Sequence, residues 1–394
     1  MRSNFQSKTP QPLINLLKQH AAPFREQWVR GEITAQLESA NIDWCLDSHG
    51  NLIAGVDNLK NYQKLLNQQN SEPLRLLIAH MDHPGFHGSD WIKPGHLRAR
   101  WLGGGPVQHL RGGLVWIADD NGIVGNGYIQ KSFRKLSGQG IETLDIRLDP
   151  SLKIAENTDA SKLYGGLDFE KSVVHRGKKI YCRAADDLTG VHIIIETLKS
   201  ALSSRRKHKA PVVGLFTRAE EVGFIGLIGH LNDGYYENSN RQLLAISLEA
   251  SRTGPGATIG KGPVIRLGDK RTAFSPAISN HMRFLGQRCL PQNHQIKLLD
   301  GGACEAAATM AWGIPTAGIA VPLGNYHNQG FEGGPGCKHP QGPAMEFVHQ
   351  DDIKAAIKLC TALASSNLSG KDLWASSRRA MNKHYREYAK LLRG

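Results

Sequence analysis

The chain has 394 residues, of which 40% are hydrophobic and 21% are charged, and its formal net charge is +13. These values are typical of a globular protein with a sizeable core, and they exclude an extensively disordered chain. Part of the positive charge lies in two basic runs, residues 205–209 and 371–393, which we interpret as solvated faces without a nucleic-acid partner, because no aromatic-rich basic motif accompanies them.

The first predicted elements form a scaffold. Apolar residues at three- and four-residue spacing predict amphipathic helices over residues 13–17 and 28–37. Two short runs, 42–46 and 52–56, flank a segment whose glycine and asparagine predict a hairpin turn, so His49 is interpreted as a turn residue.

A nearly continuous apolar run over residues 74–79 predicts a buried strand that ends at His80. In an extended segment His80 and Asp82 point to the same side. Asp82 can therefore orient the imidazole, as carboxylates commonly do for metal-bound histidines. His83 and His87 are competing candidates of lower rank, because they lie beyond the strand end.

Residues 86–176 differ from their surroundings in glycine content and in short alternating stretches. This pattern predicts a small, mostly β domain, which we place at residues 87–176, inserted into a main domain of residues 1–86 and 177–394. The three glycines at 103–105 are not expected to form a phosphate loop, because neither a Lys-Ser/Thr pair nor a helical pattern follows them.

Residues 181–190 form an extended run that ends in Asp186 and Asp187, followed by a helical pattern. Two adjacent carboxylates resist ionising together, and a bound metal removes that cost. The alternative is that Asp187 caps the helix, with Thr189 and Gly190 in its first turn.

Three further strand-like runs precede ligand-type residues. Residues 212–217 lead to Glu220 and Glu221, residues 243–248 lead to Glu249, and residues 316–321 lead through a short loop to His327. A glutamate pair at a strand end can also be the solvated start of a helix. Ligands in open α/β sheets bind outside the carboxyl ends of the strands, so five of these residues can converge on one crevice: His80, Asp186, Glu221, Glu249 and His327.

Two histidines and three carboxylates suit zinc, cobalt or manganese. Five protein ligands are too many for one catalytic zinc, but they suit two ions about 3.5–4 Å apart that share a bridging carboxylate. We expect two divalent metal ions per chain, with zinc as the first choice.

The sequence resembles the glutamyl and deblocking aminopeptidases, a family of dinuclear metallopeptidases with tetrahedral or dimeric assemblies. The matching stretches are residues 79–82 with 85–86, 102–104, 185–187 with 190, 220–223, 260–263 and 326–327, and the resemblance extends from about residue 10 to residue 365. It implies an α/β fold with a mixed central sheet flanked by helices and an inserted small β domain that mediates oligomer contacts. It also implies a homo-oligomeric enzyme that hydrolyses amino-terminal residues from peptides.

The same resemblance implies roles for individual residues. His80 and Glu249 would hold one metal, Glu221 and His327 the other, and Asp186 would bridge both. Asp82 would steady His80, and Glu220 would be the general base. A cis peptide bond between Asp186 and Asp187 is also implied.

The chain departs from the family pattern in three places. Glu249 stands where an aspartate is usual, the loop 328–339 is longer and richer in glycine, and His83-Pro84 replaces an acidic-apolar pair. These changes flank the crevice without deleting a ligand. Other functions open to the sequence are a related dinuclear carboxypeptidase or N-acyl amino acid deacylase, and an inactive binding or assembly protein of the same fold.

The carboxyl-terminal segment shows a helical pattern. Large apolar residues at 374, 381, 385, 388 and 392 lie near helical spacing and predict an amphipathic helix packed on its own chain or a neighbour's, in preference to a membrane surface.

The six cysteines form no C-x-x-C pair, the amino terminus lacks a secretory core, and no run approaches the ~20 apolar residues of a membrane span. We expect a cytoplasmic protein without membrane contact.

Overall fold

The computed structural model describes residues 9–69, 72–152, 158–203, 210–237, 239–389 and 391. The interpretations of the amino-terminal residues 1–6 and of the basic run 205–209 concern residues outside these ranges, and so do those of residue 392 in the predicted last helix and of the end of the basic run 371–393.

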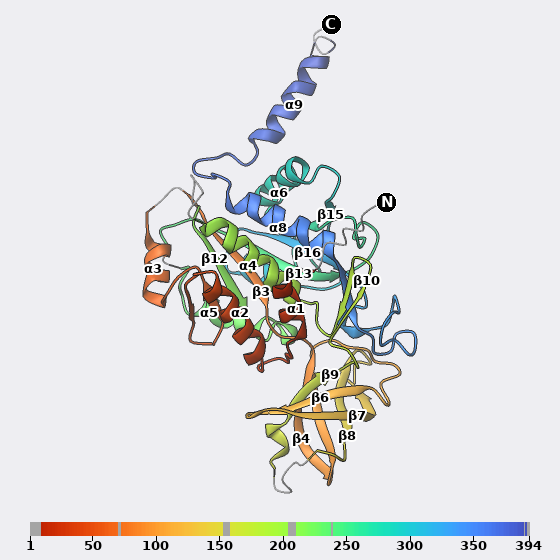
Figure 1. The fold of residues 1–394 in the computed structure, drawn as a ribbon. Helices are drawn as coiled ribbons and strands as arrows, with labels where there is room; N and C mark the ends of the chain where they lie inside the picture. The colour runs from red at the N-terminus through yellow and green to blue at the C-terminus, as the bar shows by residue number, and fades with distance from the viewer. Residues whose placement is uncertain are drawn as a thin grey trace, which may run out of the picture.

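Eight strands form the central sheet in the order β1-β2-β12-β3-β13-β16-β14-β15 (Figure 1). Strands β12, β3, β13 and β16 are parallel, so their carboxyl ends lie at one edge of the sheet. Strand β2 pairs antiparallel with β12, and β14 pairs antiparallel with β16, which makes the sheet mixed, as predicted. The bounds are β1 Trp44–Leu46, β2 Leu52–Ala54, β3 Leu74–His80, β12 Val212–Thr217, β13 Leu243–Arg252, β14 Val264–Arg266, β15 Gln295–Lys297 and β16 Thr316–Leu323.

Helices cover both faces of this sheet. The residues of strand β3 alternate between two hydrophobic cores, one on each face: Leu77 and Ala79 belong to one, and Leu76 and Ile78 to the other. Both faces therefore need covering helices. Helices α1 (Gln11–Lys18), α2 (Gln27–Ser39), α4 (Leu188–Leu202), α6 (Pro276–Cys289) and α8 (Gln350–Ala364) contribute to the first core. Helices α3 (Leu59–Asn67), α5 (Ile225–Asn232) and α7 (Glu305–Ala311) contribute to the second.

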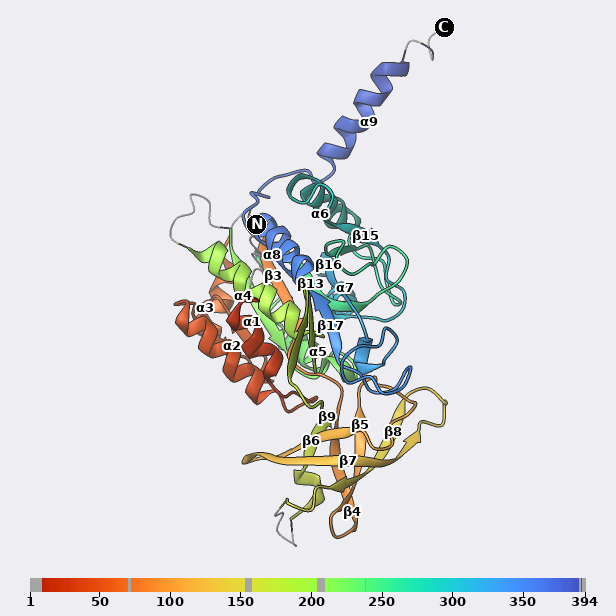
Figure 2. The same cartoon turned by 45° about the vertical axis from the view of Figure 1, so that its right-hand side comes forward.

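The predicted inserted β domain is a closed barrel of six strands in the order β4-β5-β8-β7-β6-β9, which extends from one end of the main sheet (Figure 2). Apolar side chains such as Leu97, Ile117, Ile129 and Ile146 fill its interior. The bounds are β4 Gly85–Lys93, β5 His96–Leu102, β6 Leu114–Asp119, β7 Gly122–Arg134, β8 Ile141–Leu148 and β9 Tyr164–Leu167, with a short 3-10 helix, η1, at Ala160–Lys162.

A small antiparallel sheet joins the two parts of the chain. It contains β10 (Val173–Arg176), β11 (Lys179–Cys182) and β17 (Glu346–His349), with β11 in the middle. Strand β11 leads into Asp186, so this carboxylate reaches the crevice from outside the main sheet.

The carboxyl-terminal helix α9 (Ala375–Tyr388) forms as predicted, but it does not pack on its own chain. None of its described residues is buried, and Figures 1 and 2 show it extending away from the rest of the chain. Its contacts near the start are hydrogen bonds from the amide of Asn280 to Leu373 O and Ser377 Oγ. Trp374, Met381, Tyr385 and Tyr388 are between 41% and 69% exposed.

Among the described residues, no helix is long and apolar enough to cross a lipid bilayer.

Candidate metal centre

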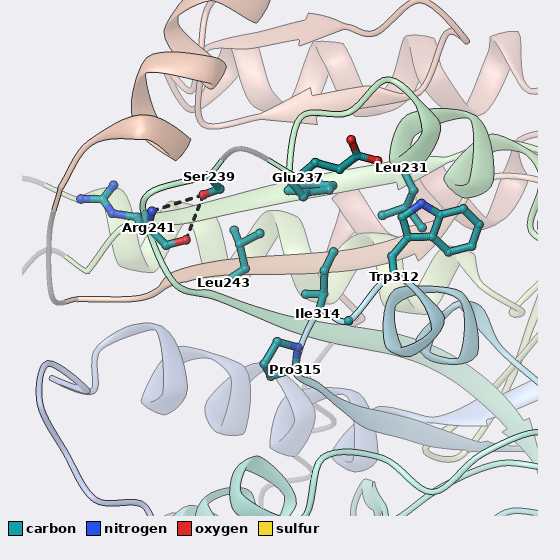
Figure 3. A pocket seen from close by; sticks show the side chains of 10 residues that line it. Leu231, Glu237, Ser239, Arg241, Leu243, Trp312, Ile314 and Pro315 are labelled. Atoms are coloured by element: carbon teal, nitrogen blue, oxygen red, sulfur yellow. Dashed lines mark hydrogen bonds between the residues drawn. The ribbon is translucent and has the colours of Figure 1, made fainter.

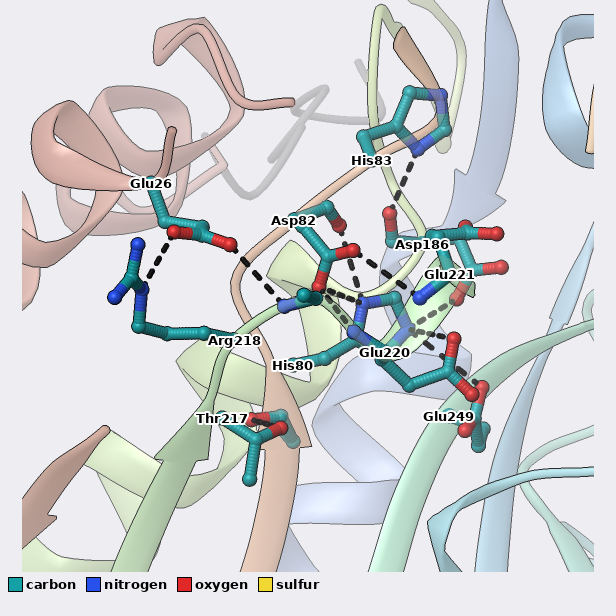
Figure 4. Close-up of polar contacts among 12 residues, drawn as sticks. Glu26, His80, Asp82, His83, Asp186, Thr217, Arg218, Glu220, Glu221 and Glu249 are labelled. Carbon is teal, nitrogen blue, oxygen red and sulfur yellow. Dashed lines mark hydrogen bonds and ion pairs between the residues drawn. The ribbon is translucent and has the colours of Figure 1, made fainter. Parts of the chain in front are cut away.

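The predicted ligands come together at the carboxyl ends of the parallel strands. His80 is the last residue of β3, Glu249 lies within β13, and Glu221 follows β12 in the 3-10 helix η2 (Glu220–Val222). Figure 4 shows these side chains and Asp186 pointing toward one another. His327 reaches the same place from the 3-10 helix η3 (Tyr326–Asn328), which follows β16.

Asp186 lies between the two histidines. Its Oδ1 is 3.5 Å from Nε2 of His80, and its Oδ2 is 3.6 Å from Nε2 of His327. The peptide bond from Asp186 to Asp187 is cis, which confirms the implied geometry. Each oxygen of one carboxylate thus faces a different imidazole.

Two groups of possible ligands share Asp186. Ligand atoms of His80, Asp186 and Glu249 lie within 4.8 Å of one another, and so do those of Asp186, Glu221 and His327. These groups match the two predicted metal sites. A third group of the same size, His80, Glu220 and Glu221, offers an alternative in which Glu220 is a ligand.

Three buried oxygens in this cluster make no hydrogen bond among the described residues: Oδ1 of Asp186, Oε1 of Glu221 and Oε1 of Glu249. Two of them lie near a histidine, Oδ1 of Asp186 near His80 and Oε1 of Glu221 near His327. Gathering several buried carboxylates in one place is costly. Burial, followed by the charge of Asp186, raises the pKa of Glu249 to about 8. A divalent cation offsets both effects, so the donor set fits metal ions of the zinc, cobalt or manganese type.

The electrostatics of Asp186 differ from those of Glu249. Burial alone would raise its pKa, but the nearby imidazoles of His327 and His80 outweigh that effect and hold the pKa well below the ordinary range. Asp186 is therefore more readily ionised than Glu249.

Asp82 contacts His80 and the glutamate turn together. The Nδ1 of His80 lies 3.1 Å from the backbone oxygen of Asp82 and 3.6 Å from its Oδ1. The two carboxylate oxygens accept hydrogen bonds from the backbone N–H groups of Glu220 and Glu221, at 2.9 and 3.1 Å. Asp82 thus lies beside His80 as predicted, and its carboxylate also orients the turn that carries both glutamates.

Glu220 is buried beside the ligand cluster, with its Oε2 3.9 Å from Nε2 of His80. Burial, reinforced by the neighbouring Glu249 and Glu221 carboxylates and opposed by His80, raises the pKa of Glu220 well above its ordinary value. A carboxyl group with a strongly raised pKa beside a ligand cluster is a candidate for proton transfer.

The lower-ranked candidates have other partners. His83 contacts the backbone oxygen of Asp186 through Nδ1 and the side-chain oxygen of Asn328 through Nε2, each at 3.0 Å. His87 contacts the backbone oxygen of Pro23. Asp187 accepts a hydrogen bond from the N–H of Gly190. Asp187 is thus the helix cap, as the alternative interpretation predicted, and Asp186 is the member of the pair that lies in the ligand cluster.

Glu346, on β17, is a buried residue that the sequence interpretation missed. Its Oε2 accepts hydrogen bonds from the N–H groups of Ala185 and Asp186, and its Oε1 accepts one from His327 N–H at 2.8 Å. One carboxylate therefore fixes the backbone of two predicted ligands. The available signal was a lone acid inside the apolar run 344–348, because a buried charge needs partners.

The barrel contributes a loop to the edge of the site. A Cβ atom added to Gly104 would lie 1.9 Å from Nδ1 of His327, and one added to Gly103 would lie 3.2 Å from Cβ of Glu221. The glycines at 103 and 104 thus allow the loop to approach both side chains.

Two cavities differ in their relation to these residues. One of about 290 Å³ borders Glu249 and Tyr326 and is also lined by Arg252, Arg266 and Lys297. The other, of about 180 Å³, contains no predicted site residue (Figure 3). Its lining includes Leu231, Glu237, Ser239, Arg241, Leu243, Trp312, Ile314 and Pro315.

The mixed α/β sheet, the inserted barrel and the acid-histidine cluster define an α/β protein with a candidate metal centre at the carboxyl ends of its parallel strands. The model of the M42 glutamyl aminopeptidase family matches residues 62–332, which is more than half of the chain, and the chain belongs to this family. It is a metal-dependent aminopeptidase. No curated protein matches the chain in sequence.

Solved structures share its fold. The TET1 peptidase of Pyrococcus horikoshii, which can assemble into a tetrahedron or a large octahedral shell, is 24% identical with a TM-score of 0.68; the match covers 90% of this chain and 98% of that one. An aminopeptidase from the archaeon Desulfurococcus kamchatkensis is 20% identical with a TM-score of 0.69, over 90% of this chain and 94% of that one.

Proposed function

We propose that this aminopeptidase holds two zinc ions and that Asp186 bridges them. His80 and Glu249 complete one site, and Glu221 and His327 complete the other. The observation that carries this assignment is the position of Asp186, whose two oxygens each face a different histidine at 3.5 and 3.6 Å. Cobalt or manganese would suit the same oxygen and nitrogen donors.

The metal ions and Glu220 would then have separate roles in hydrolysis. When bound, the two ions polarise the scissile carbonyl and lower the pKa of water. Glu220 accepts the proton of the attacking water at its carboxylate and passes it to the leaving amine. Asp82 holds the turn that presents Glu220.

Two isosteric variants test the division of roles between the neighbouring glutamates. Glu220→Gln should retain both metals and lose ~10²–10⁴-fold in kcat, because an amide cannot take up the proton. Glu221→Gln should lose one metal. The measurements are metal content by elemental analysis and hydrolysis of peptides with free and blocked amino termini, of which only the free ones should be cleaved. Metal loss in Glu220→Gln would support the alternative ligand group instead.

We further propose that the enzyme prefers an acidic amino-terminal residue. The cavity beside Glu249 is lined by the cations Arg252, Arg266 and Lys297, against the acids Glu249 and Asp300. Arg266 is 3% exposed, and its Nε has no hydrogen-bond partner among the described residues. A buried guanidinium at a cavity wall favours a carboxylate ligand.

The preference is measured as the ratio of kcat/KM for peptides that begin with glutamate and with leucine. Arg266→Met should lower this ratio ~10-fold or more, since it removes a buried partner of the carboxylate. Arg241→Met is the matched control, because Arg241 is also buried but lines the other cavity. An unchanged ratio in Arg266→Met would exclude this pocket as the source of the preference.

The remaining proposals concern assembly and location. We propose that residues 87–176 act as an oligomerisation domain and that the enzyme is a homo-oligomer acting on peptides. The related fold of TET1, which assembles into shells, supports this. The six free cysteines support a cytoplasmic location.

A further inference from the structure

The turn that carries Glu220 and Glu221 is held through its backbone. Each of the four consecutive N–H groups of residues 218–221 donates to a side chain from another part of the chain. The acceptors, in order, are Asn51 Oδ1 at 3.0 Å, Glu26 Oε1 at 3.1 Å, Asp82 Oδ1 at 2.9 Å and Asp82 Oδ2 at 3.1 Å. Ala219, in the middle of the turn, has a φ of 52°. A non-glycine residue keeps this left-handed conformation only when its surroundings impose it.

Glu26 is the acceptor at this strained residue. It is 2% exposed, and both of its oxygens are occupied (Figure 4). Oε1 accepts hydrogen bonds from the N–H groups of Ala219 and Phe24, and Oε2 accepts one from Nε of Arg218 at 2.8 Å. The Arg218 guanidinium also donates to the backbone oxygens of Phe24 and His49. One carboxylate thus joins the start of α2 to both residues that precede Glu220.

The segment around Glu26 is itself anchored. Arg25 forms an ion pair with Asp120 at 2.8 Å, and the amide of Gln27 donates to the hydroxyl of Tyr164 at 2.6 Å. Asp120 and Tyr164 belong to the barrel, whereas α2 packs in the core of the main domain. Glu26 is therefore a fixed point from which the turn is positioned.

We propose that Glu26 is a positioning residue for catalysis: it holds Ala219 so that Glu220 meets the attacking water and Glu221 meets its metal. This inference rests on the roles proposed above for the two glutamates. Glu26 acts on the turn through one hydrogen bond, from Ala219 N–H, and one ion pair, with Arg218.

Two variants change the charge and the position of the Glu26 carboxylate one at a time. Glu26→Gln keeps the size of the side chain but places an N–H₂ donor opposite another donor, either Ala219 N–H or Arg218 Nε–H. Glu26→Asp keeps the charge but draws the carboxylate back by one methylene. Both should lower kcat ~10–100-fold, the range typical of residues that orient metal ligands. KM should change less than about threefold, because substrate binding is not altered.

Glu72→Gln is the matched control. Glu72 is also a buried carboxylate that pairs with an arginine, Arg75, and accepts backbone hydrogen bonds, here from Leu368 and Ser369 at 2.9–3.0 Å. It lies at the opposite end of β3 from His80. Its loss should lower the melting temperature, as the loss of Glu26 does, but leave kcat unchanged.

A second readout does not depend on turnover. Titration of the metal-free full-length chain with Co²⁺, followed by visible absorption, should show one site weakened ~10-fold in Glu26→Gln and Glu26→Asp, and no change in Glu72→Gln. If the parent enzyme released no amino-terminal residues, the proposed function would fail, while the Co²⁺ titration would still test Glu26. The inference is overturned if both Glu26 variants keep the parental kcat and Co²⁺ affinity, or if Glu72→Gln loses as much. Glu26→Asp alone carries the test if Glu26→Gln does not fold.

Discussion

At the level of single residues, the site depends on close contacts between the barrel loop and the ligand side chains as much as on the ligands themselves. His327 lies against the backbone of Gly104, so the barrel loop limits where its imidazole can go. A methyl group at residue 104 would overlap Nδ1 of His327 at 1.9 Å, which is far inside van der Waals contact. Either the loop or the imidazole must move.

We therefore expect Gly104→Ala to lower metal occupancy at the site that contains His327 and to reduce kcat/KM ~10-fold or more, since small misplacements of reacting groups have effects of this size. Gly31→Ala is the control, because a Cβ at Gly31 would meet no atom within 4 Å. Elemental analysis and peptide kinetics measure both effects. Full metal occupancy and parental kinetics in Gly104→Ala would show that the loop moves to accommodate the methyl group without disturbing His327.

The sequence was informative about residues that follow apolar strands and uninformative about their supports. His80, Glu221 and Glu249 could be predicted because β3, β12 and β13 are continuous apolar runs. Glu26 could not, because its role depends on the N–H of Ala219, which is 193 residues away along the chain. Glu346 could be noticed as a lone acid in an apolar run, but its partners at Ala185 and His327 could not be identified from that run. Hydrogen bonds to the backbone leave no pattern in the sequence of the donor.

At the scale of elements, the scaffold helices and the central strands agree with the sequence patterns, since burial on one or both faces imposes a period on apolar residues. The helix α9 was predicted from the same kind of period, yet it is exposed. An amphipathic pattern indicates that a helix has an apolar face, but it does not identify the surface that covers that face.

Helix α4 provides a prediction on stability and pH. His192 on α4 is 1% exposed, and burial, together with Lys199, lowers its pKa to about 4 from an ordinary value of 6.5. Between about pH 4 and 6.5 the unfolded chain binds a proton there that the folded chain does not, so stability falls as the pH falls through this window. At pH 4 the loss should approach ~3 kcal/mol.

His192→Leu should flatten the dependence of stability on pH between 4 and 6.5, because leucine does not titrate. The measurement is the denaturant midpoint at several pH values for the parent and the variant, compared by slope. Parallel curves for the two chains would show that His192 does not contribute to the acid loss.

At the scale of the whole molecule, the barrel extends from one end of the main domain (Figure 2). Closed symmetric oligomers are common among enzymes of this size. We expect light scattering at micromolar concentration to give a mass of at least twice the 43.2 kDa of one chain. A strict monomer would contradict the proposed role of the barrel in assembly.

Metal content per chain shows whether Asp186 bridges two metal ions. The parent chain, purified with zinc present and freed of loosely bound metal, should contain two ions. Asp186→Asn should lose metal at both sites, melt at a lower temperature and lose peptide hydrolysis, because the bound ions stabilise only the folded chain. Two metal ions per chain with normal turnover in Asp186→Asn would contradict the account.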